Sequence, residues 1–467
     1  MANKFSRYYQ IIKSAIRGDE YDFTTIDLRK AVILLAIPMM LELALESVFA
    51  VVDIFFVNKL GIHAVSVVGL TESVITIVYS IGIGLSAAAT AMVARRVGEK
   101  NYEAASHAGA QAIILAIIAS LILAIPGYIF AQEILELMGA ETAAIEQGLG
   151  YTRIMFGGNI VIVLLFLING IFRGAGNASI AMKSLWIGNI FNIILDPLLI
   201  FGIAFFPEFG IKGAALATTT GRGIGVLYQV YHLWKSSGSL KIKWRHFKPD
   251  LKILKGLSGI ASPATFQFII ASASWIFLAS MVAEYGSAAS AGYQTAIRLV
   301  VFFILPAWGM SNAVATLVGQ NLGADLPQRA EQSVKITTRY NVIFMAIVTV
   351  FFMLYAYPLV RLFIPEQQSD QVKYAVLSLQ IISCGYIFYG IGMVITQAFN
   401  GAGDTSTPTW VYFFGFWTFQ IPFAYILHKY TAIGITGIFI AVPIAETLMT
   451  IAVFLLFKRG TWKLMKV

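Results

Sequence analysis

The chain of 467 residues is 58% hydrophobic and only 12% charged. A soluble globular protein averages about 25% charged residues, so the composition excludes a water-soluble protein and predicts a polytopic membrane protein in a lipid bilayer. The net charge of +9 comes from basic residues in the connections between apolar segments, which argues against a nucleic-acid partner. The single cysteine, Cys384, excludes an internal disulfide, and its apolar neighbours predict that it is buried.

The first 30 residues form a polar and basic segment that is too hydrophilic for a cleavable signal peptide. We interpret residues 1–30 as a cytoplasmic N-terminal segment whose amphipathic part lies on the membrane surface. A disordered tail is the alternative that this stretch leaves open.

Twelve apolar segments, each long enough to cross a membrane as a helix, follow the N-terminal segment. They lie at residues 31–57, 65–93, 107–130, 150–172, 180–203, 211–234, 257–283, 290–318, 336–356, 374–398, 409–428 and 433–457. We therefore predict an all-α protein with twelve transmembrane helices, because a helix satisfies its own backbone polar groups inside a bilayer.

Basic residues are distributed unequally between the two sides of this predicted membrane protein. They collect at the N-terminus and in connections after even-numbered segments, whereas the connection at 131–149 holds four glutamates and no basic residue. Lys and Arg stay cytoplasmic in short loops, so both termini are predicted to be cytoplasmic. We expect a multi-pass protein of the inner (plasma) membrane.

The first segment carries three carboxylates, Glu42, Glu46 and Asp53. Because a helix turns by about 100° per residue, their spacings place all three side chains on one narrow stripe. That stripe must face protein or a water-filled cavity, since a carboxylate facing lipid is costly. Pro38, one turn before Glu42, removes a backbone hydrogen bond and marks a place where the helix can bend.

The fifth segment carries a second polar face, with Asn189, Asn192 and Asp196 at helical spacing. With the first-segment carboxylates, these oxygens can hold a proton, since burial disfavours an ionised carboxylate, or Na⁺, which prefers oxygen ligands. The predicted cation-coupling residues are Asp53, Asp196, Asn192, Asn189, Glu46 and Thr218. The predicted ligands of Na⁺ are Asp53, Asn192, Asp196 and Thr218, with Asn169 as a further oxygen donor.

Structural roles are the alternative for each of these residues. They are a local hydrogen bond of Asp196 beside Pro197, interhelical bonds from Asn189 and Asn192, and a pair between Asp53 and either Arg153 or Arg222. Glu42 lies nearest the predicted cytoplasmic side of its segment and can equally be structural.

Landmark residues recur at a fixed distance of 225 positions. The pairs are Pro38 and Pro263, Gly61 and Gly286, Gly98 and Gly323, and Pro197 and Pro422. Each repeat holds an even number of segments, so we predict two six-helix lobes related by a pseudo-twofold axis along the membrane normal. Such repeats are typical of transporters, whose substrate path runs between the halves. A duplication that only builds a large scaffold is the alternative.

The segment boundaries predict the domain organisation. The N-lobe covers 31–234, a polar linker 235–256, the C-lobe 257–457 and a cytoplasmic tail 458–467. The acidic site is confined to the N-lobe, since the positions equivalent to Glu46, Asp53 and Asp196 are Ala271, Leu278 and Ile421. The interior charges of the C-lobe are Arg298 and Glu446, for which we predict a structural ion pair.

Motifs along nearly the whole chain resemble those of the multidrug and toxic compound extrusion (MATE) transporters. They are IPMMLELALESVFAVVDIFFVNKLG at 37–61, VARRVGEKN at 93–101, NGIFRGAGNAS at 169–179, NIILDPLLIFG at 192–202 and NGAGDTSTP at 400–408. The resemblance implies a twelve-helix antiporter with two lobes, a V-shaped central cavity and alternating access.

The DinF-like and archaeal branch of that family is similar in detail. Its coupling aspartate falls on Asp53, its bending proline on Pro38, and its fifth-span pair on Asn192 and Asp196. The substrate-cavity residues that the resemblance implies are Tyr151, Asn169, Asp53 and Asp196, with Thr218 as a further position. Glu46 departs from the branch, which has a neutral glutamine there, and two carboxylates on one stripe can share a proton.

These features predict a secondary active antiporter that exports cationic or amphipathic organic compounds in exchange for H⁺ or Na⁺. We expect a monomer with a small-molecule organic substrate, no catalytic residue and no cofactor. A flippase for lipid-linked precursors is one alternative, but it would need more cavity cations than Arg153, Arg222 and Arg298. A membrane-embedded enzyme is the other, and no metal or nucleophile constellation supports it.

Overall fold

The computed structural model describes the backbone of residues 2–203, 206–235, 240–364 and 369–467, and their side chains except those of residues 2–8, 50, 51 and 54. These described residues form helices and connecting loops, with no β-strand among them. The protein is therefore all-α, as predicted.

The N-terminal half forms an amphipathic helix, α1, and then the helices of the first lobe. They are α1 (Ala2–Arg17), α2 (Leu28–Asn58), α3 (Ile62–Gly98), α4 (Tyr102–Ile129), α5 (Ala131–Leu137), α6 (Thr142–Gly157), α7 (Asn159–Gly174), α8 (Ala178–Phe201) and α9 (Ile211–Lys235). Side-chain oxygens of Asp27, Asn101 and Asn177 accept hydrogen bonds from the first turns of α2, α4 and α8. These caps explain where the helices begin, because the first backbone N–H groups of a helix lack partners within it.

A short 3₁₀ turn, η1 (Trp244–Phe247), leads into the second lobe. Its helices are α10 (Leu251–Ala283), α11 (Ser287–Gly323), α12 (Pro327–Arg361), α13 (Ser369–Ser383), α14 (Tyr386–Ala402), α15 (Ser406–Tyr412), α16 (Ile421–Tyr430) and α17 (Ile435–Arg459). A π-helix, Phe413–Gln420, joins α15 to α16. We call α2–α9 the N-lobe and α10–α17 the C-lobe.

Each of the twelve predicted membrane segments coincides with described helix. Ten segments in the described part are long and apolar enough to cross a membrane, and the pair α13 and α14, bent by 54°, makes an eleventh. The remaining predicted segment is α9, a helix of 25 residues with three threonines and Arg222 near its middle. The helices α6 and α7 together form the fourth segment, Thr142–Gly174.

The internal repeat is visible in the backbone. Lys100 and Asp325, 225 positions apart, are the described non-glycine residues with positive φ, and both have φ of 58°. The lobes also meet through exchanged pairs, since α2 packs on α11 and α3 packs on α10. Exchanging the two repeats converts one of these contacts into the other, which is the signature of a pseudo-twofold axis.

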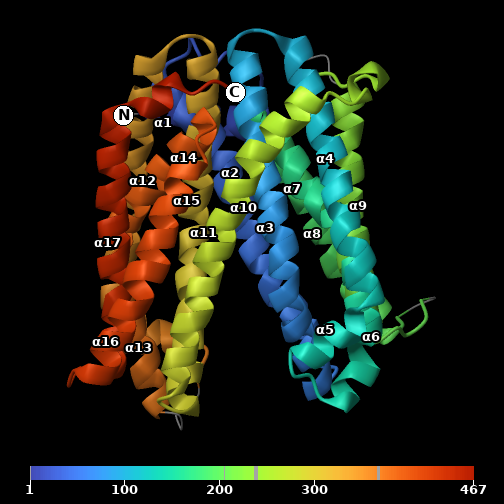
Figure 1. The fold of residues 1–467 in the computed structure, drawn as a ribbon, viewed down its shortest axis with the longest axis vertical. Coiled ribbons are helices and arrows are strands. Elements are labelled where there is room, and N and C mark those ends of the chain that lie inside the picture. The colour runs from blue at the N-terminus through green and yellow to red at the C-terminus, as the bar shows by residue number, and fades with distance from the viewer. Residues whose placement is uncertain (1, 204–205, 236–239, 365–368) are drawn as a thin grey trace.

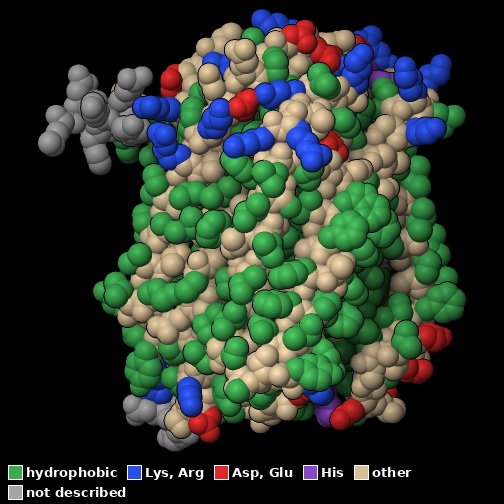
Figure 2. Space-filling view, turned by 60° about the vertical axis from the view of Figure 1, so that its left-hand side comes forward, with side chains coloured by type: hydrophobic (Ala, Val, Ile, Leu, Met, Phe, Trp, Pro, Cys, Tyr) green, Lys and Arg blue, Asp and Glu red, His purple; other side chains and the backbone are tan. Residues whose placement is uncertain are grey.

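The two lobes come together at the end that carries both termini and diverge toward the opposite end (Figure 1). Lys and Arg side chains gather over the end with the termini, and hydrophobic side chains cover the middle of the molecule (Figure 2). We call the end with the termini the basic end. The apolar middle provides the lipid-facing surface that the composition predicts.

Segments next to the termini connect the lobes at the basic end. Arg329 of α12 donates hydrogen bonds to backbone carbonyls of Phe23 and Ile26, which precede α2. Arg95 of α3 donates to the Met465 carbonyl oxygen at 2.8 Å. The C-lobe thus binds the segment that leads into the N-lobe, and the N-lobe binds the tail that follows the C-lobe. These contacts favour closure of the two lobes at the basic end.

The structure corrects two sequence-based predictions. Cys384 is exposed rather than buried, because it lies at the break between α13 and α14. Arg298 is exposed on α11 and forms no ion pair with Glu446 in the described part of the chain. Apolar neighbours did not reveal burial here, since lipid-facing positions are as apolar as the protein interior.

Candidate functional site

The side chain of Glu42 is bound inside the N-lobe by two residues of α7. Its side chain is 1% exposed, and Oε1 accepts a hydrogen bond from Asn169 Nδ2 at 3.0 Å. Arg173, one helical turn further along α7, forms an ion pair with the same oxygen. A carboxylate held in this way is compensated in its buried position, so the structural interpretation of Glu42 is the one that these contacts favour.

Glu46, one turn further along α2, is held by the next two helices. Asn189 of α8 donates to its Oε2 at 3.1 Å, and Arg222 of α9 lies 3.3 Å from its Oε1. Arg222 is almost fully buried, so this ion pair lies inside the lobe. Arg222 was one of the two arginines predicted as alternative partners for Asp53. In the structure its ion pair is with Glu46.

Asp53 and Asp196 have no such partner. Asp53 lies within electrostatic range of Arg222 and of Asp196, but it forms no ion pair or hydrogen bond with described residues. Asp196 is fully buried, and neither of its carboxylate oxygens has a hydrogen-bond partner among the described residues. Two carboxylates in this condition can each gain a proton or share a cation.

Asn192 provides a further unpaired oxygen on α8, next to Asp196. Its Nδ2 donates to Thr218 Oγ1 of α9 at 3.1 Å, which turns its Oδ1 away from that bond. This Oδ1 is buried without a partner, one helical turn before the Asp196 carboxylate. No group of three His, Cys, Asp or Glu in the described chain could hold a metal ion, so a Na⁺ site here would need oxygen ligands besides carboxylates. Asn192 Oδ1 is such an oxygen, next to the unpaired carboxylate of Asp196.

One acid of this cluster, Glu72 of α3, is absent from the residues predicted from the sequence. Glu72 lies within electrostatic range of Asp53 and Arg222 and beside Tyr151 of α6. The N-lobe cluster, as we call it, comprises Glu46, Asp53, Glu72, Asp196 and Arg222. A lone glutamate inside the apolar segment 65–93 was the signal that could have revealed it.

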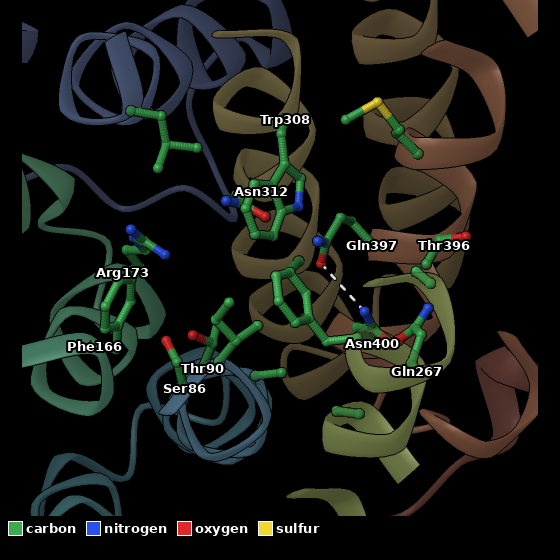
Figure 3. A pocket seen from close by; sticks show the side chains of 18 of the residues that line it. Ser86, Thr90, Phe166, Arg173, Gln267, Trp308, Asn312, Thr396, Gln397 and Asn400 are labelled. Atoms are coloured by element: carbon green, nitrogen blue, oxygen red, sulfur yellow. Dashed lines mark hydrogen bonds between the residues drawn. The ribbon is translucent and has the colours of Figure 1, made fainter. Parts of the chain in front are cut away.

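A separate cavity of about 220 Å³ lies between the lobes (Figure 3). Its polar lining includes Ser86, Thr90, Arg173, Gln267, Asn312, Thr396, Gln397 and Asn400. Its aromatic lining includes Phe166, Phe268, Trp308, Tyr389 and Tyr412. Arg173 is the only charged residue among the described residues that line it, and Glu42 neutralises that charge.

The residues predicted for the substrate cavity do not line this inter-lobe cavity. Tyr151 and Asn169 are buried inside the N-lobe, and Asp53 and Asp196 belong to the N-lobe cluster. Asn169 joins three helices of the N-lobe, because from α7 it donates to Glu42 of α2 and accepts from Ser184 of α8 at 3.1 Å. Pro38 lies in α2, where the helix continues without interruption.

Comparison with known proteins places this architecture in a family. The MatE family model matches residues 38–198 and 263–426, two stretches whose first residues are again 225 positions apart. The probable multidrug resistance protein YoeA of Bacillus subtilis is 27% identical over 90% of this chain and 91% of its own. The probable multidrug resistance protein NorM of Thermotoga maritima is 27% identical over 97% of each chain.

Solved structures agree with the sequence relationship. A structure described as the outward-facing conformation of a multidrug resistance MATE family transporter superposes with a TM-score of 0.88. It is 26% identical and covers 95% of this chain and 98% of its own. Because the matched stretches include most of both lobes, the chain belongs to the MatE family and is a multi-pass membrane transporter rather than an enzyme.

Proposed function

We propose that this transporter exports cationic or amphipathic organic compounds in exchange for H⁺ or Na⁺, with the coupling acids in the N-lobe. The observation that carries the proposal is the condition of Asp53 and Asp196, which lie within electrostatic range of each other without a hydrogen bond to described residues. Relatives named multidrug resistance proteins support the class of substrate.

The chemistry of the inter-lobe cavity supports a cationic or amphipathic substrate. Aromatic faces of Phe166, Phe268 and Trp308 can bind apolar groups and attract organic cations. The single cation of the described lining is neutralised by Glu42, which leaves no cluster of positive charge for phosphate groups. This disfavours a flippase for lipid-linked precursors.

In the proposed mechanism, the basic end faces the cytoplasm and the described conformation opens away from it. Uptake of H⁺ or Na⁺ by Asp53 and Asp196 removes negative charge from the N-lobe and weakens the attraction for a cationic substrate. The substrate leaves, the lobes rock, and the ion is released on the cytoplasmic side. A ligand shifts such an equilibrium only through unequal affinity for the two states, and carboxylate occupancy supplies that inequality.

Transport in proteoliposomes tests the proposal. Purified protein is reconstituted, and efflux of ethidium, an organic cation, is followed under an imposed ΔpH or an imposed ΔNa⁺. We expect one gradient to drive efflux, and Asp53→Asn and Asp196→Asn to lose that dependence. Undiminished gradient-driven efflux by both variants would reject the coupling role of the two aspartates.

The matched control is Glu133→Gln, which neutralises an exposed glutamate of α5 in the same lobe. It should transport like the unmodified protein, because Glu133 lies outside the N-lobe cluster. A monomer in the inner membrane remains our expectation for the working unit.

A further inference from the structure

Glu446 is a buried acid of the C-lobe that the proposed coupling site does not use. It lies in the middle of α17 and is only 9% exposed. Neither an ion pair nor a hydrogen bond joins it to the described part of the chain, and its predicted partner Arg298 is exposed elsewhere. An unpaired ionised carboxylate in such a position is costly, so acids of this kind inside membrane proteins usually have a function.

Glu446 lines a small cavity of about 20 Å³. Tyr386 and Tyr389 of α14 line the same cavity, together with Gly385 and Pro443. The Tyr386 side chain is 2% exposed, and its hydroxyl has no hydrogen-bond partner among the described residues. A volume of this size accommodates about one water molecule, which would need polar partners such as these two side chains.

The small cavity adjoins the inter-lobe cavity. Tyr389 and Ile304 line both cavities, so these two side chains lie between Glu446 and the inter-lobe cavity. Tyr412, which lines the inter-lobe cavity, lies within electrostatic range of Glu446 as well. The titratable groups that face Glu446 are thus tyrosines, and the α10 and α11 residues of the small cavity, Trp275, Val300 and Ile304, carry no charge.

Irregular backbone converges on this place from three helices. The 54° break between α13 and α14 ends at Gly385, beside the cavity. The π-helix begins at Phe413, directly after Tyr412. Pro443 interrupts the hydrogen bonding of α17 one turn before Glu446. Discontinuous helices and π-segments inside membrane transporters commonly mark ion or substrate sites, because irregular backbone is tolerated where it lines a cavity.

We propose that Glu446 is a second proton-binding site, in the C-lobe, which exchanges protons with the inter-lobe cavity past Tyr389. On uptake, a proton from cavity water joins a carboxylate oxygen to form the neutral acid, and release reverses that step. The site offers one carboxylate and phenol hydroxyls but lacks the amide oxygens found beside Asp196, so it suits H⁺ rather than Na⁺. This proposal rests on the proposed function in one respect, because the bound proton would be carried across the membrane by the rocking of the lobes.

Infrared titration of the purified protein in lipid nanodiscs tests proton binding directly, without transport. We expect the carbonyl stretch of a protonated carboxyl group to appear and disappear with pH in the unmodified protein. One component of that signal should be lost in Glu446→Gln and retained in Asp53→Asn. An unchanged signal in Glu446→Gln would overturn the proposal.

Two further variants sharpen the test. Tyr389→Phe keeps the ring but removes the hydroxyl, so the carboxyl signal of Glu446 should remain while its hydrogen–deuterium exchange slows. Glu284→Gln, which neutralises an exposed acid next to α10, should leave the titration unchanged. Equal exchange rates in Tyr389→Phe and the unmodified protein would contradict the route past Tyr389.

Transport separates this proposal from the coupling role of the N-lobe cluster. In ethidium proteoliposomes, Glu446→Gln should change the pH dependence of efflux, whereas Asp53→Asn should remove the coupling. If efflux by the unmodified protein is absent, the proposed function fails but the infrared titration still decides the role of Glu446. A pH profile in Glu446→Gln that superposes on that of the unmodified protein would count against a role in transport.

Discussion

Glu42 and Asp53 occupy one stripe of α2, yet their surroundings differ completely. Glu42 is paired with Arg173 and bonded to Asn169, whereas Asp53 forms no described hydrogen bond or ion pair. A charge that is paired in a buried position stabilises one conformation, while an unpaired acid can change its charge at lower cost. Two carboxylates on the same stripe therefore differ in role: Glu42 serves structure and, as we propose, Asp53 serves coupling.

A residue-scale prediction concerns the pair of Glu42 and Arg173. Arg173→Gln should lower the free energy of unfolding by about 3–5 kcal/mol, because it leaves an uncompensated buried carboxylate. The double variant Glu42→Gln with Arg173→Gln should recover most of that loss, since no buried charge remains. Thermal unfolding of the detergent-solubilised variants measures both, and a double variant less stable than Arg173→Gln would contradict the prediction.

At the scale of elements, the lobes meet where α3 crosses α11. A Cβ atom on Gly98 would overlap with the carbonyl oxygen of Gln320, and one on Gly323 would overlap with that of Arg95. The two contacts are related by the repeat, since each partner is displaced by 225 positions. These glycines let the helix ends approach closely at the basic end, as small residues do in membrane helix packing.

Gly98→Ala and Gly323→Ala should each destabilise the described conformation by about 1–3 kcal/mol, because the added methyl group forces the backbones apart. Gly259→Ala is the matched control, since this exposed glycine of α10 has nothing within 4 Å of an added Cβ. Thermal unfolding of the three variants provides the measurement. Equal stability of Gly98→Ala and Gly259→Ala would show that the α3–α11 crossing tolerates separation.

At the scale of the whole molecule, charge is distributed along the long axis. Basic side chains gather at one end of the molecule (Figure 2), which is the end where the lobes meet and both termini lie (Figure 1). Since Lys and Arg are retained on the cytoplasmic side during insertion, this distribution orients the proposed transport cycle. The described conformation would then open to the outside.

Reporter fusions check this orientation. A green fluorescent protein fused after Val467 should fluoresce, and alkaline phosphatase at the same place should be inactive, because that end is predicted to be cytoplasmic. Alkaline phosphatase fused after Gly139, in the connection between α5 and α6, should be active. The reverse result at both positions would invert the proposed direction of transport.

The sequence by itself predicted the helices and their pairing into repeats. Hydrophobic length defines a membrane helix locally, and the spacing of Pro38 from Pro263 does not depend on how the helices pack. The stripe of carboxylates on α2 followed from helical periodicity alone. The predicted lobe boundaries and the coupling roles remain predictions to be tested by the experiments above.

Tertiary structure decided which acids are paired. Arg222 could have neutralised Asp53 or Glu46, and only the crossing of α2, α8 and α9 places it on Glu46. It also brought Glu72 to Tyr151 and separated Arg298 from Glu446. Sequence periodicity gives the face on which a charge lies, but the energy of that charge depends on neighbours from other helices. Because of that dependence, the sequence was sufficient to predict the helices but not the partners of their charged side chains.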